Sequence, residues 1–277
     1  MYDAIETVGQ SIVQHGGYND RIYLMKLAAE DAPGIITALD TLAASEGYSK
    51  VFAKVPASAL GAFIEHGYVV EAHVPGFFNG VEDAYFMGKY RSRQRRRFAA
   101  RESIDKIIEL AKLKTDGWMM GELPSGYHIR VLAEGDIAQV VELYLQVFDT
   151  YPFPIYDPEY IRETMHDHIV YFGVFVGNTL VAVSSSEIDT GAGNVEMTDF
   201  ATLPEHRGQG LAAHLLREME EKMRTRGMRV AYTIARAPSL GINTTFARMG
   251  YRYGGTLVNN TNISGSFESM NVWYKRL

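Results

Sequence analysis

The sequence predicts an α/β protein with a mixed sheet, and two observations carry this prediction. Strand and helix patterns follow the order strand-helix-strand-helix-strand-strand within residues 21–90, and the same order returns near the end of the chain. In both places a short helix closes on a matching motif, Phe63-Ile-Glu-His-Gly-Tyr68 and Phe246-Ala-Arg-Met-Gly-Tyr251. We interpret the match as an internal repeat of a half-domain. The alternative is a chance likeness between two helix-to-strand junctions.

Length and composition narrow the class of protein. At 277 residues the chain has room for two domains, and cysteine is absent, which excludes disulfides, thiolate metal sites and cysteine nucleophiles. The net charge of −6 disfavours nucleic-acid binding and favours a cationic substrate. Because no apolar run could span a membrane and no signal pattern opens the chain, we expect a cytoplasmic protein without membrane partners. The oligomeric state stays open, a homodimer included.

The N-terminal block reads as four strands and two helices. The first helix is expected over 31–47, with Asp31 at its start, Pro33 in its first turn and Gly47 at its end. A short helix follows at 57–67. The strands are predicted at 21–27, 49–55, 68–74 and 84–90.

A basic run and a helix separate the two blocks. Residues 91–101 read RSRQRRRFAAR, which we interpret as a solvated connector; a nucleic-acid patch is the alternative, but no aromatic platform accompanies it. Over 102–114 apolar side chains fall on one helical face, which predicts a linker helix that packs on a domain: Ile104, Ile107, Ile108 and Ala111.

The second block begins near Ser125 and continues the alternation. Its expected strands are 127–133, a hairpin over 171–189 that turns at Gly177-Asn178, then 194–203, 228–235, 251–258 and 267–277. Its expected helices follow Asp136, Gly210 and Ile242. Residues 149–160 carry three prolines and four aromatic residues and are expected to form a loop.

The segment Arg207-Gly-Gln-Gly210-Leu-Ala212 has the chemistry of a phosphate cradle. Gly208, Gly210 and Ala212 stand where a helix begins, so small residues would let an anion approach unpaired backbone N–H groups at the positive end of the helix dipole. Arg207 adds a fixed charge. The segment is not a P-loop, since no Gly-Lys-Ser/Thr follows, and it lacks the third glycine of the dinucleotide fingerprint.

This segment fits the pattern Gln/Arg-x-x-Gly-x-Gly/Ala, and residues 126–277 around it resemble the GNAT N-acetyltransferase superfamily. The resemblance implies a C-terminal GNAT acyl-CoA N-acyltransferase fold beside an N-terminal truncated GNAT-like half-domain. It also implies that backbone N–H groups of Arg207, Gly208, Gln209, Gly210, Leu211 and Ala212 hold the pyrophosphate of acetyl-CoA. Backbone at Ala201, Thr202 and Leu203 would pair with the pantetheine arm, and a bulge there would leave an N–H to polarise the thioester carbonyl.

A closer resemblance covers nearly the whole chain. The segments FAKVP, EAHVPGFFNG and AYFMGKY and the closing run GGTLVNNTNISGSFESMNVWYKRL are similar to the β-lysine N-acetyltransferases. The resemblance implies an acetyl-CoA cosubstrate, no metal, and acetylation of the ε-amine of a small diamino acid to give the compatible solute Nε-acetyl-β-lysine. The implied division is a half-domain without a cofactor site (1–98), a linker helix (99–124) and a catalytic domain (125–277).

An amine attacks a thioester only when it is neutral, and a lysine-type amine has a pKa near 10.4, so the site needs a base. The candidates are Glu196, where several GNAT enzymes place a base, and Asp199. Strand alternation puts these two on opposite faces unless a bulge intervenes. The family's usual tyrosine acid is Phe246 here, so either Tyr232, Tyr251 or Tyr253 acts or CoA leaves as a thiolate. Asn243 is a candidate cofactor ligand.

Substrate recognition needs acids for ammonium groups and donors for a carboxylate. The candidates are the loop Asp149–Tyr160, the polar segment Asn259–Asn262 and, for the carboxylate, Arg162. The pair His166 and His168 lacks a third ligand at metal spacing, so no metal is expected.

Two other functions remain open at this stage. One is a GNAT enzyme that acetylates another amine, such as a polyamine or a protein lysine. The other is a non-catalytic acyl-CoA sensor, which the absent tyrosine keeps open.

Overall fold

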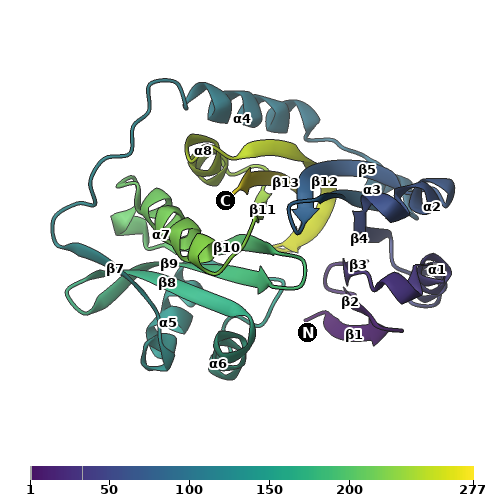
Figure 1. Ribbon diagram of the computed structural model, residues 1–277, viewed down its shortest axis with the longest axis horizontal. Helices are drawn as coiled ribbons and strands as arrows, with labels where there is room; N and C mark the ends of the chain where they lie inside the picture. The colour runs from purple at the N-terminus through teal and green to yellow at the C-terminus, as the bar shows by residue number, and fades with distance from the viewer. Residues whose placement is uncertain (1, 33) are drawn as a thin grey trace.

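Residues 2–32 and 34–277 are described by a computed structural model, and their strands form one mixed sheet (Figure 1). The order across this sheet is β1-β2-β3-β4-β6-β5-β12-β13-β11-β10-β9-β8-β7. The expected α/β class is therefore confirmed. No helix in the described part of the chain is long and apolar enough to cross a membrane.

The N-terminal region contributes the first six strands and two helices of more than one turn. Its elements are β1 (Ala4–Val8), β2 (Ser11–Gly16), β3 (Arg21–Lys26), α1 (Ile35–Ser45), β4 (Lys50–Pro56), α2 (Leu60–Glu65), β5 (Val69–Phe78) and β6 (Glu82–Tyr90). The predicted helix over 31–47 is α1, although Pro33 lies outside the described residues. The hairpin of β1 and β2 was not predicted, because β1 is an exposed edge strand without apolar alternation.

The remaining elements begin with the basic run and the linker helix. They are α3 (Arg93–Arg96), α4 (Arg101–Leu113), β7 (Tyr127–Val131), α5 (Ile137–Val147), α6 (Pro158–Asp167), β8 (Ile169–Val176), β9 (Thr179–Asp189), β10 (Asn194–Thr202), α7 (Leu211–Thr225), β11 (Val230–Arg236), α8 (Leu240–Arg248), β12 (Arg252–Ile263) and β13 (Ser266–Arg276). Helix α6 was not predicted, although Asp157 caps it and Pro158 opens it.

Two sets of elements repeat one arrangement, and we call them the N-terminal copy (β3 to β6) and the C-terminal copy (β10 to β13). Each begins with a parallel pair and continues with antiparallel pairs, in the orders β3-β4-β6-β5 and β10-β11-β13-β12. The copies run in opposite order across the sheet and meet where β5 pairs with β12. A Cβ at Gly255 would lie 2.2 Å from the Glu71 carbonyl oxygen, so only glycine lets them meet.

The contacts within the two sequence motifs are also the same. The Phe63 and Tyr68 rings lie 4.9 Å apart edge to face, and so do the Phe246 and Tyr251 rings. In each copy the tyrosine N–H donates to the phenylalanine carbonyl, at 3.1 and 3.0 Å. The intervening Gly67 and Gly250 have φ of +84° and +82°, which closes both helices with the same left-handed turn.

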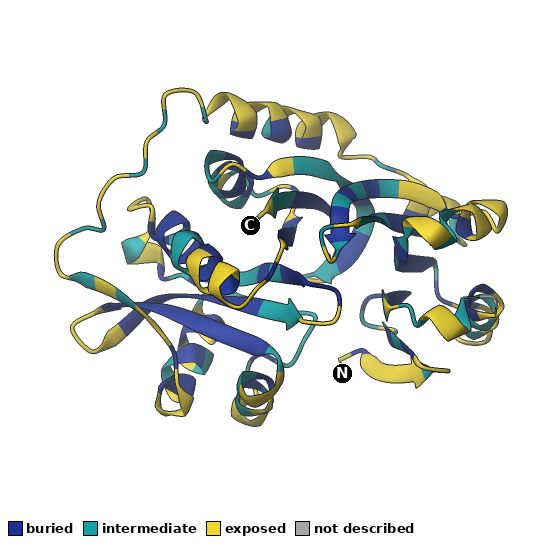
Figure 2. Cartoon of the chain, in the orientation of Figure 1, coloured by how far each residue is buried: buried dark blue, intermediate teal, exposed yellow. Residues whose placement is uncertain are grey.

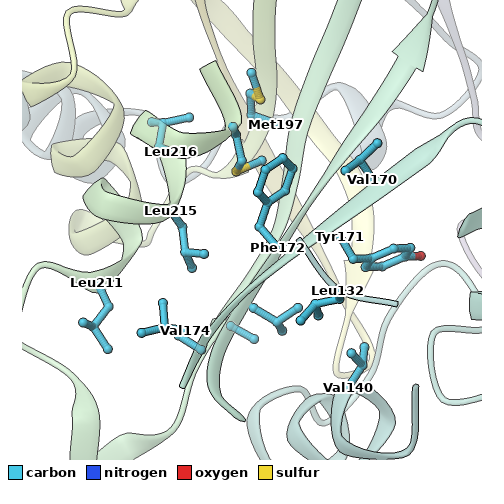
Figure 3. Close-up of a cluster of buried hydrophobic side chains, with 14 of the residues drawn as sticks. Leu132, Val140, Val170, Tyr171, Phe172, Val174, Met197, Leu211, Leu215 and Leu216 are labelled. Atoms are coloured by element: carbon cyan, nitrogen blue, oxygen red, sulfur yellow. The ribbon is translucent and has the colours of Figure 1, made fainter. Parts of the chain in front are cut away.

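The largest core lies on the C-terminal part of the sheet. Phe172, Val174 and Met197 face Leu211 and Leu215 of α7, whereas the alternate residue Tyr171 faces the side of α5 (Figure 3). The sheet-facing sides of α5 and α7 are buried and their outer sides are exposed (Figure 2). Both faces of this part of the sheet are therefore covered.

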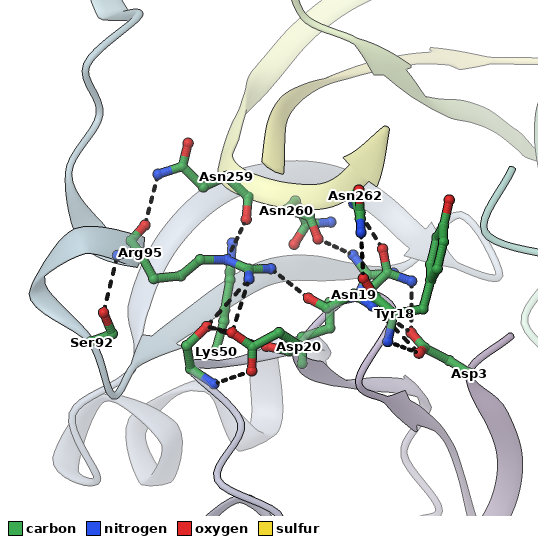
Figure 4. Close-up of polar contacts among 12 residues, drawn as sticks. Asp3, Tyr18, Asn19, Asp20, Lys50, Ser92, Arg95, Asn259, Asn260 and Asn262 are labelled. Carbon is green, nitrogen blue, oxygen red and sulfur yellow. Dashed lines mark hydrogen bonds and ion pairs between the residues drawn. The ribbon is translucent and has the colours of Figure 1, made fainter. Parts of the chain in front are cut away.

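The linker helix α4 packs on α8 and uses the predicted face. Ile104 and Ile108 are buried against Ala237, while Ile107 is half-buried. The basic run before it is not only a solvated connector, because Arg95 is 3% exposed. Its Nε donates to the Asn259 carbonyl at 2.7 Å and its Nη2 to the Asn19 carbonyl at 2.8 Å (Figure 4). Arg95 therefore joins the linker to both copies.

Candidate active site

A cavity of about 670 Å³ lies between the two halves of the molecule. The C-terminal half contributes β9, β10 and the segment 147–155, and the N-terminal half contributes Arg21, Tyr23 and Phe52. The halves approach here because Tyr23 and Phe52 share an aromatic cluster with Phe86 and Tyr232. The sheet thus curves until the N-terminal copy forms one wall of the cavity.

A β-bulge places both predicted carboxylates in this cavity. The pairing of β10 with β9 shifts between Thr198 and Ala201, and Asp199 has a φ of +55°. As a result Glu196 and Asp199 line the same cavity instead of facing opposite sides. The structure adds Glu187 of β9, which pairs with Glu196 across the sheet. We refer to Glu187, Glu196 and Asp199 as the acid cluster.

Asp199 is held by three hydroxyl groups. Ser185 Oγ donates to one carboxylate oxygen at 2.5 Å, while the Tyr151 hydroxyl and, at 3.4 Å, Thr198 Oγ1 donate to the other. Burial raises the pKa of Asp199, and these hydrogen bonds oppose the rise. Because its oxygens already accept these hydrogen bonds, Asp199 is less available to accept a proton than a free carboxylate.

Glu196 has the electrostatics of a base that works near neutral pH. Burial, followed by the negative charge of Glu187, raises its pKa to about 7, while Lys54 acts in the opposite direction. The pKa of Glu187 is raised as well, first by burial. A carboxyl group with a pKa near 7 exists in both protonation states at physiological pH, which suits proton transfer.

Lys54 comes from β4 of the N-terminal copy and lies behind the acid cluster. Its Nζ donates to the Tyr232 hydroxyl at 3.3 Å and lies 5.4 Å from the centre of the Tyr23 ring. Burial alone would lower the pKa of Lys54, but Tyr23, Glu196 and Glu187 outweigh burial and raise it. Lys54 therefore stays charged and balances part of the acid cluster.

The strands β10 and β11 separate beside Glu196. Their parallel pairing runs from Asn194–Val230 to Glu196–Tyr232 and ends there, although β10 continues to Thr202 and β11 to Arg236. On its other edge β10 stays paired with β9 as far as Thr202. The wedge leaves one edge of β10 open beyond Glu196, which an extended ligand could join as a strand.

The predicted cradle lies at the N-terminus of α7, beyond this wedge. Gly208 and Gly210 have φ of +80° and +75°, and an added Cβ at either position would meet no described atom within 4 Å. Among the hydrogen bonds of the described residues, none has its donor in the backbone N–H groups of 208–212. These groups and the helix dipole fit an anionic phosphate.

Other predicted cofactor residues are engaged within the protein. The Arg207 N–H donates to the Pro204 carbonyl at 3.3 Å, and its Nε to the Thr202 carbonyl at 3.1 Å. The Leu203 N–H donates to Val181 of β9 at 3.0 Å. By strand alternation Ala201 turns its N–H toward β9 and Thr202 turns its N–H toward the open wedge.

Asn243 is buried, and its amide fastens α8 to the sheet. Its Nδ2 donates to the Ser239 and Arg236 carbonyls at 2.7 and 3.0 Å, and its Oδ1 accepts from Asn271 and Trp273 at 2.9 and 2.8 Å. The structure therefore gives this side chain a structural role and does not bring it to the cradle.

The candidate general acids do not reach the cavity. Phe246 is fully buried, and among the described residues that line the cavity none is Tyr232, Tyr251 or Tyr253. Tyr253 shares a hydrogen bond of 2.5 Å with Thr256, and Tyr232 accepts from Lys54. Among the tyrosines that do line the cavity, Tyr151 donates to Asp199.

The predicted substrate-binding segments lie only partly in the cavity wall. Much of 149–160 lines the cavity, as do Asn260 and Thr261, but Asn259 and Asn262 join the two halves through Arg95 and Asn19 (Figure 4). Arg162 is not in the cavity wall and is paired with Glu134 and Glu159, so the prediction for it is wrong.

The two histidines of the 166–168 pair have separate partners. His166 Nε2 lies 2.9 Å from a Glu134 oxygen, and His168 Nδ1 lies 2.6 Å from an Asp167 oxygen. The two rings therefore serve different surface contacts.

Sequence reasoning missed the contribution of the N-terminal copy. Arg21, Tyr23 and Lys54 lie in segments that were identified as strands, and alternation alone gives no reason to place them beside Glu196. A weak signal was present: Arg21 and Lys54 are charged residues in strands that are mostly apolar, although Lys26 and Lys50 share it.

The chain is similar to known acetyltransferases over nearly its whole length. The acetyltransferase (GNAT) family matches residues 137–251. A β-lysine N(6)-acetyltransferase of Methanococcus maripaludis is 40% identical over 99% of this chain and 98% of its own length. A protein of the same name from Methanosarcina mazei is 32% identical over 88% of this chain and 97% of its own length. The N-acetyltransferase YodP of Bacillus subtilis is 32% identical over the full length of both chains.

Proposed function

Since the chain belongs to the GNAT N-acetyltransferases, and within them to the family of the β-lysine N(6)-acetyltransferases, we propose that its acceptor is the N6 amino group of β-lysine. The product would be Nε-acetyl-β-lysine, a compatible solute made in the cytoplasm. The observation that carries this proposal is the full-length similarity to two relatives of that name, together with a cavity that the N-terminal half completes.

The chemistry of the cavity supports a small cationic acceptor. The acid cluster carries more carboxylates than the reaction needs as base, so it can also attract the reacting ammonium group of a diamino acid. The aromatic and aliphatic lining, which includes Tyr160, Tyr171 and Ile155, suits a methylene chain.

Acetyl-CoA, the acetyl donor of the family, fits the wedge and the cradle. The open edge of β10 at Thr202 would pair with the pantetheine arm, and the free N–H groups of 208–212 would hold the pyrophosphate. Arg207 would add charge at the mouth of the cavity, which it lines. The bulge at 198–201 faces the end of this path, where the thioester would lie.

Glu196 is proposed as the general base. The ammonium group of the acceptor gives one proton to the Glu196 carboxylate, directly or through water, and the neutral amine forms the C–N bond to the acetyl carbon. As the C–S bond breaks, the nitrogen loses its second proton to solvent, which leaves the neutral amide. The raised pKa of Glu196 makes its carboxylate a stronger base than a solvated one. Asp199, fixed by Ser185 and Tyr151, would help to hold the cation.

The leaving group is proposed to depart as a thiolate. None of the three candidate tyrosines lines the described cavity, and Phe246 cannot donate a proton. A thiol with a pKa near 8.5 is a good enough leaving group to need no acid at its sulfur.

The division of the chain into 1–98, 99–124 and 125–277 also remains a proposal. It is supported by the repeated strand order and by the acidic residues Glu30 and Asp31, which precede α1 where the second copy has its cradle. Negative charge at that position repels a pyrophosphate. The N-terminal half-domain would therefore shape the acceptor site and hold no CoA of its own.

The test is a panel of amines with acetyl-CoA and a readout of released thiol. We expect β-lysine to give the highest kcat/KM, with α-lysine and spermidine far lower. Equal or better use of spermidine or of a lysine-containing peptide would overturn the assignment of substrate. Binding of acetyl-CoA without turnover of any amine would instead indicate a sensor.

A further inference from the structure

The cavity contains a buried positive charge that has no carboxylate partner. Arg21 of β3 is 4% exposed and lines the cavity. Its Nη1 donates to the Asn260 carbonyl at 2.6 Å and lies 3.4 Å from Thr261 Oγ1, while its Nε is buried without a hydrogen-bond partner among the described residues. Burial lowers the pKa of Arg21 to about 10, so the guanidinium is still charged at neutral pH.

Two neighbouring buried cations are, by contrast, each paired with a carboxylate. Lys50 lies 2.8 Å from a Glu71 oxygen, and Arg95 lies 3.6 Å from an Asp20 oxygen. Among the ion pairs of the described residues, none includes Arg21. Asp3, whose negative charge acts on Arg21, accepts a hydrogen bond from Asn19 Nδ2 at 2.6 Å. An unpaired buried charge is costly, typically by several kcal/mol, which points to an anion supplied by a ligand.

A free acceptor lies beside this free donor. Asn260 is 1% exposed, lines the cavity, and has an Oδ1 without a hydrogen-bond partner in the described structure. Its backbone carbonyl accepts from Arg21 Nη1, and both residues line the same cavity. A guanidinium next to an amide oxygen is suited to a carboxylate that carries an ammonium group close by.

The spacing within the cavity separates this pair from the acid cluster. Arg21 lies two residues before Tyr23 on β3, about 7 Å along a strand. Burial raises the pKa of Tyr23, and the charges of Glu196 and Glu187 add to the rise, so Tyr23 lies close to the acid cluster. Arg21 and Glu196 thus stand apart along the wall of one cavity, as the two ends of an extended amino acid require.

We propose that Arg21 binds the carboxylate of the acceptor and that Asn260 Oδ1 accepts from its adjacent ammonium group, so that the N-terminal half-domain selects amino acids over simple diamines. This inference rests on the proposed function and deepens it. Arg21 holds the unreactive end of the substrate, while the acid cluster receives the reacting amine at the other end.

The experiment compares β-lysine with β-lysinamide, in which the carboxylate becomes a neutral amide, and with 1,4-diaminopentane, which lacks it. We expect Arg21→Gln to lower kcat/KM for β-lysine at least about 100-fold and to change that for the other two amines less than about threefold. Arg21→Lys, which keeps the charge, should recover part of the loss. Arg162→Gln, a surface arginine in ion pairs, is the matched control and should leave all three values unchanged.

Thermal melting of each variant separates recognition from folding. Equal losses for all three amines in Arg21→Gln, or no loss for β-lysine, would overturn the inference. If the wild-type enzyme acetylates α-lysine but not β-lysine, the proposed substrate fails, and the same comparison is made with α-lysine and cadaverine. If the wild type prefers diamines to both amino acids, or if β-lysine binds the CoA-saturated wild type and Arg21→Gln equally in calorimetry, the role of Arg21 is refuted.

Discussion

The N-terminal and C-terminal copies share their framework but differ in the residues that carry chemistry. In the register of the parallel strands, Tyr23 of the first copy takes the position of Glu196 in the second, and Phe52 takes the position of Tyr232. Structural contacts are kept: Lys89 pairs with Asp40 of α1, and Lys275 pairs with Glu220 of α7. The comparison teaches that one half-domain can be used twice, once for catalysis and once as a wall of the acceptor site.

The largest difference between the copies is expected when the equivalent residues Glu196 and Tyr23 are each replaced by a side chain of similar size and shape. We expect Glu196→Gln to lower kcat by about 10² to 10⁴, because the amide cannot accept the proton from the amine. Tyr23→Phe, at the equivalent position, should change kcat only a few-fold. Thiol release at saturating substrate measures both, and comparable losses would contradict the assignment of the base.

The cradle offers the next largest contrast. Gly210→Val should raise KM for acetyl-CoA about 10- to 100-fold, because valine is strained at a φ of +75° and would displace the N–H groups at the start of α7. Gly34→Val, at the start of α1 with a φ of −111°, should leave that KM unchanged. An unchanged KM in Gly210→Val would place the pyrophosphate elsewhere.

A pH profile tests how Lys54 of the N-terminal copy changes the pKa of Glu196 in the C-terminal copy. Glu196 must be deprotonated, so kcat should rise with pH around an apparent pKa of about 7. Lys54 lowers that pKa, so Lys54→Met should move the rise upward by about 1 pH unit or more. Activity near pH 7 should fall and recover at higher pH. If kcat of Lys54→Met is lower by the same factor at every pH, Lys54 has only a structural role.

The smallest effects on catalysis are expected at the repeated lysines. Lys275→Met leaves Glu220, which is 4% exposed, with Arg224 alone, and should lower the free energy of unfolding by about 2 kcal/mol. Lys89→Met removes the partner of Asp40. Because both side chains of this pair are partly exposed, the free energy of unfolding should fall by less than about 1 kcal/mol. Urea denaturation measures both, and a larger loss in Lys89→Met would contradict the ranking.

The sequence predicted what depends on local pattern. The order of strands and helices, the motif at Phe63 and Phe246, and the small residues at Gly208 and Gly210 follow from periodicity and turn chemistry, and the structure has them where expected. Helix α6 was missed because prolines and aromatic residues around its start resemble a loop.

The rest of the site depends on tertiary structure. Glu196 was named, but whether Asp199 could share its cavity depended on a bulge that the residues 198–201 do not reveal. Arg21 reaches the cavity, and Lys54 acts on the acid cluster, only because the two copies curve toward each other after meeting at Gly255. Arg162 was a poor choice because its surface partners were not visible in the sequence.

Calorimetric titration of CoA into the full-length protein tests the central claim, that the chain repeats its half-domain but builds one cofactor site. The account predicts one CoA bound per chain, with binding lost or strongly weakened in Gly210→Val and unaffected in Gly34→Val. Two CoA molecules per chain, or a single one whose binding Gly210→Val leaves intact, would contradict it.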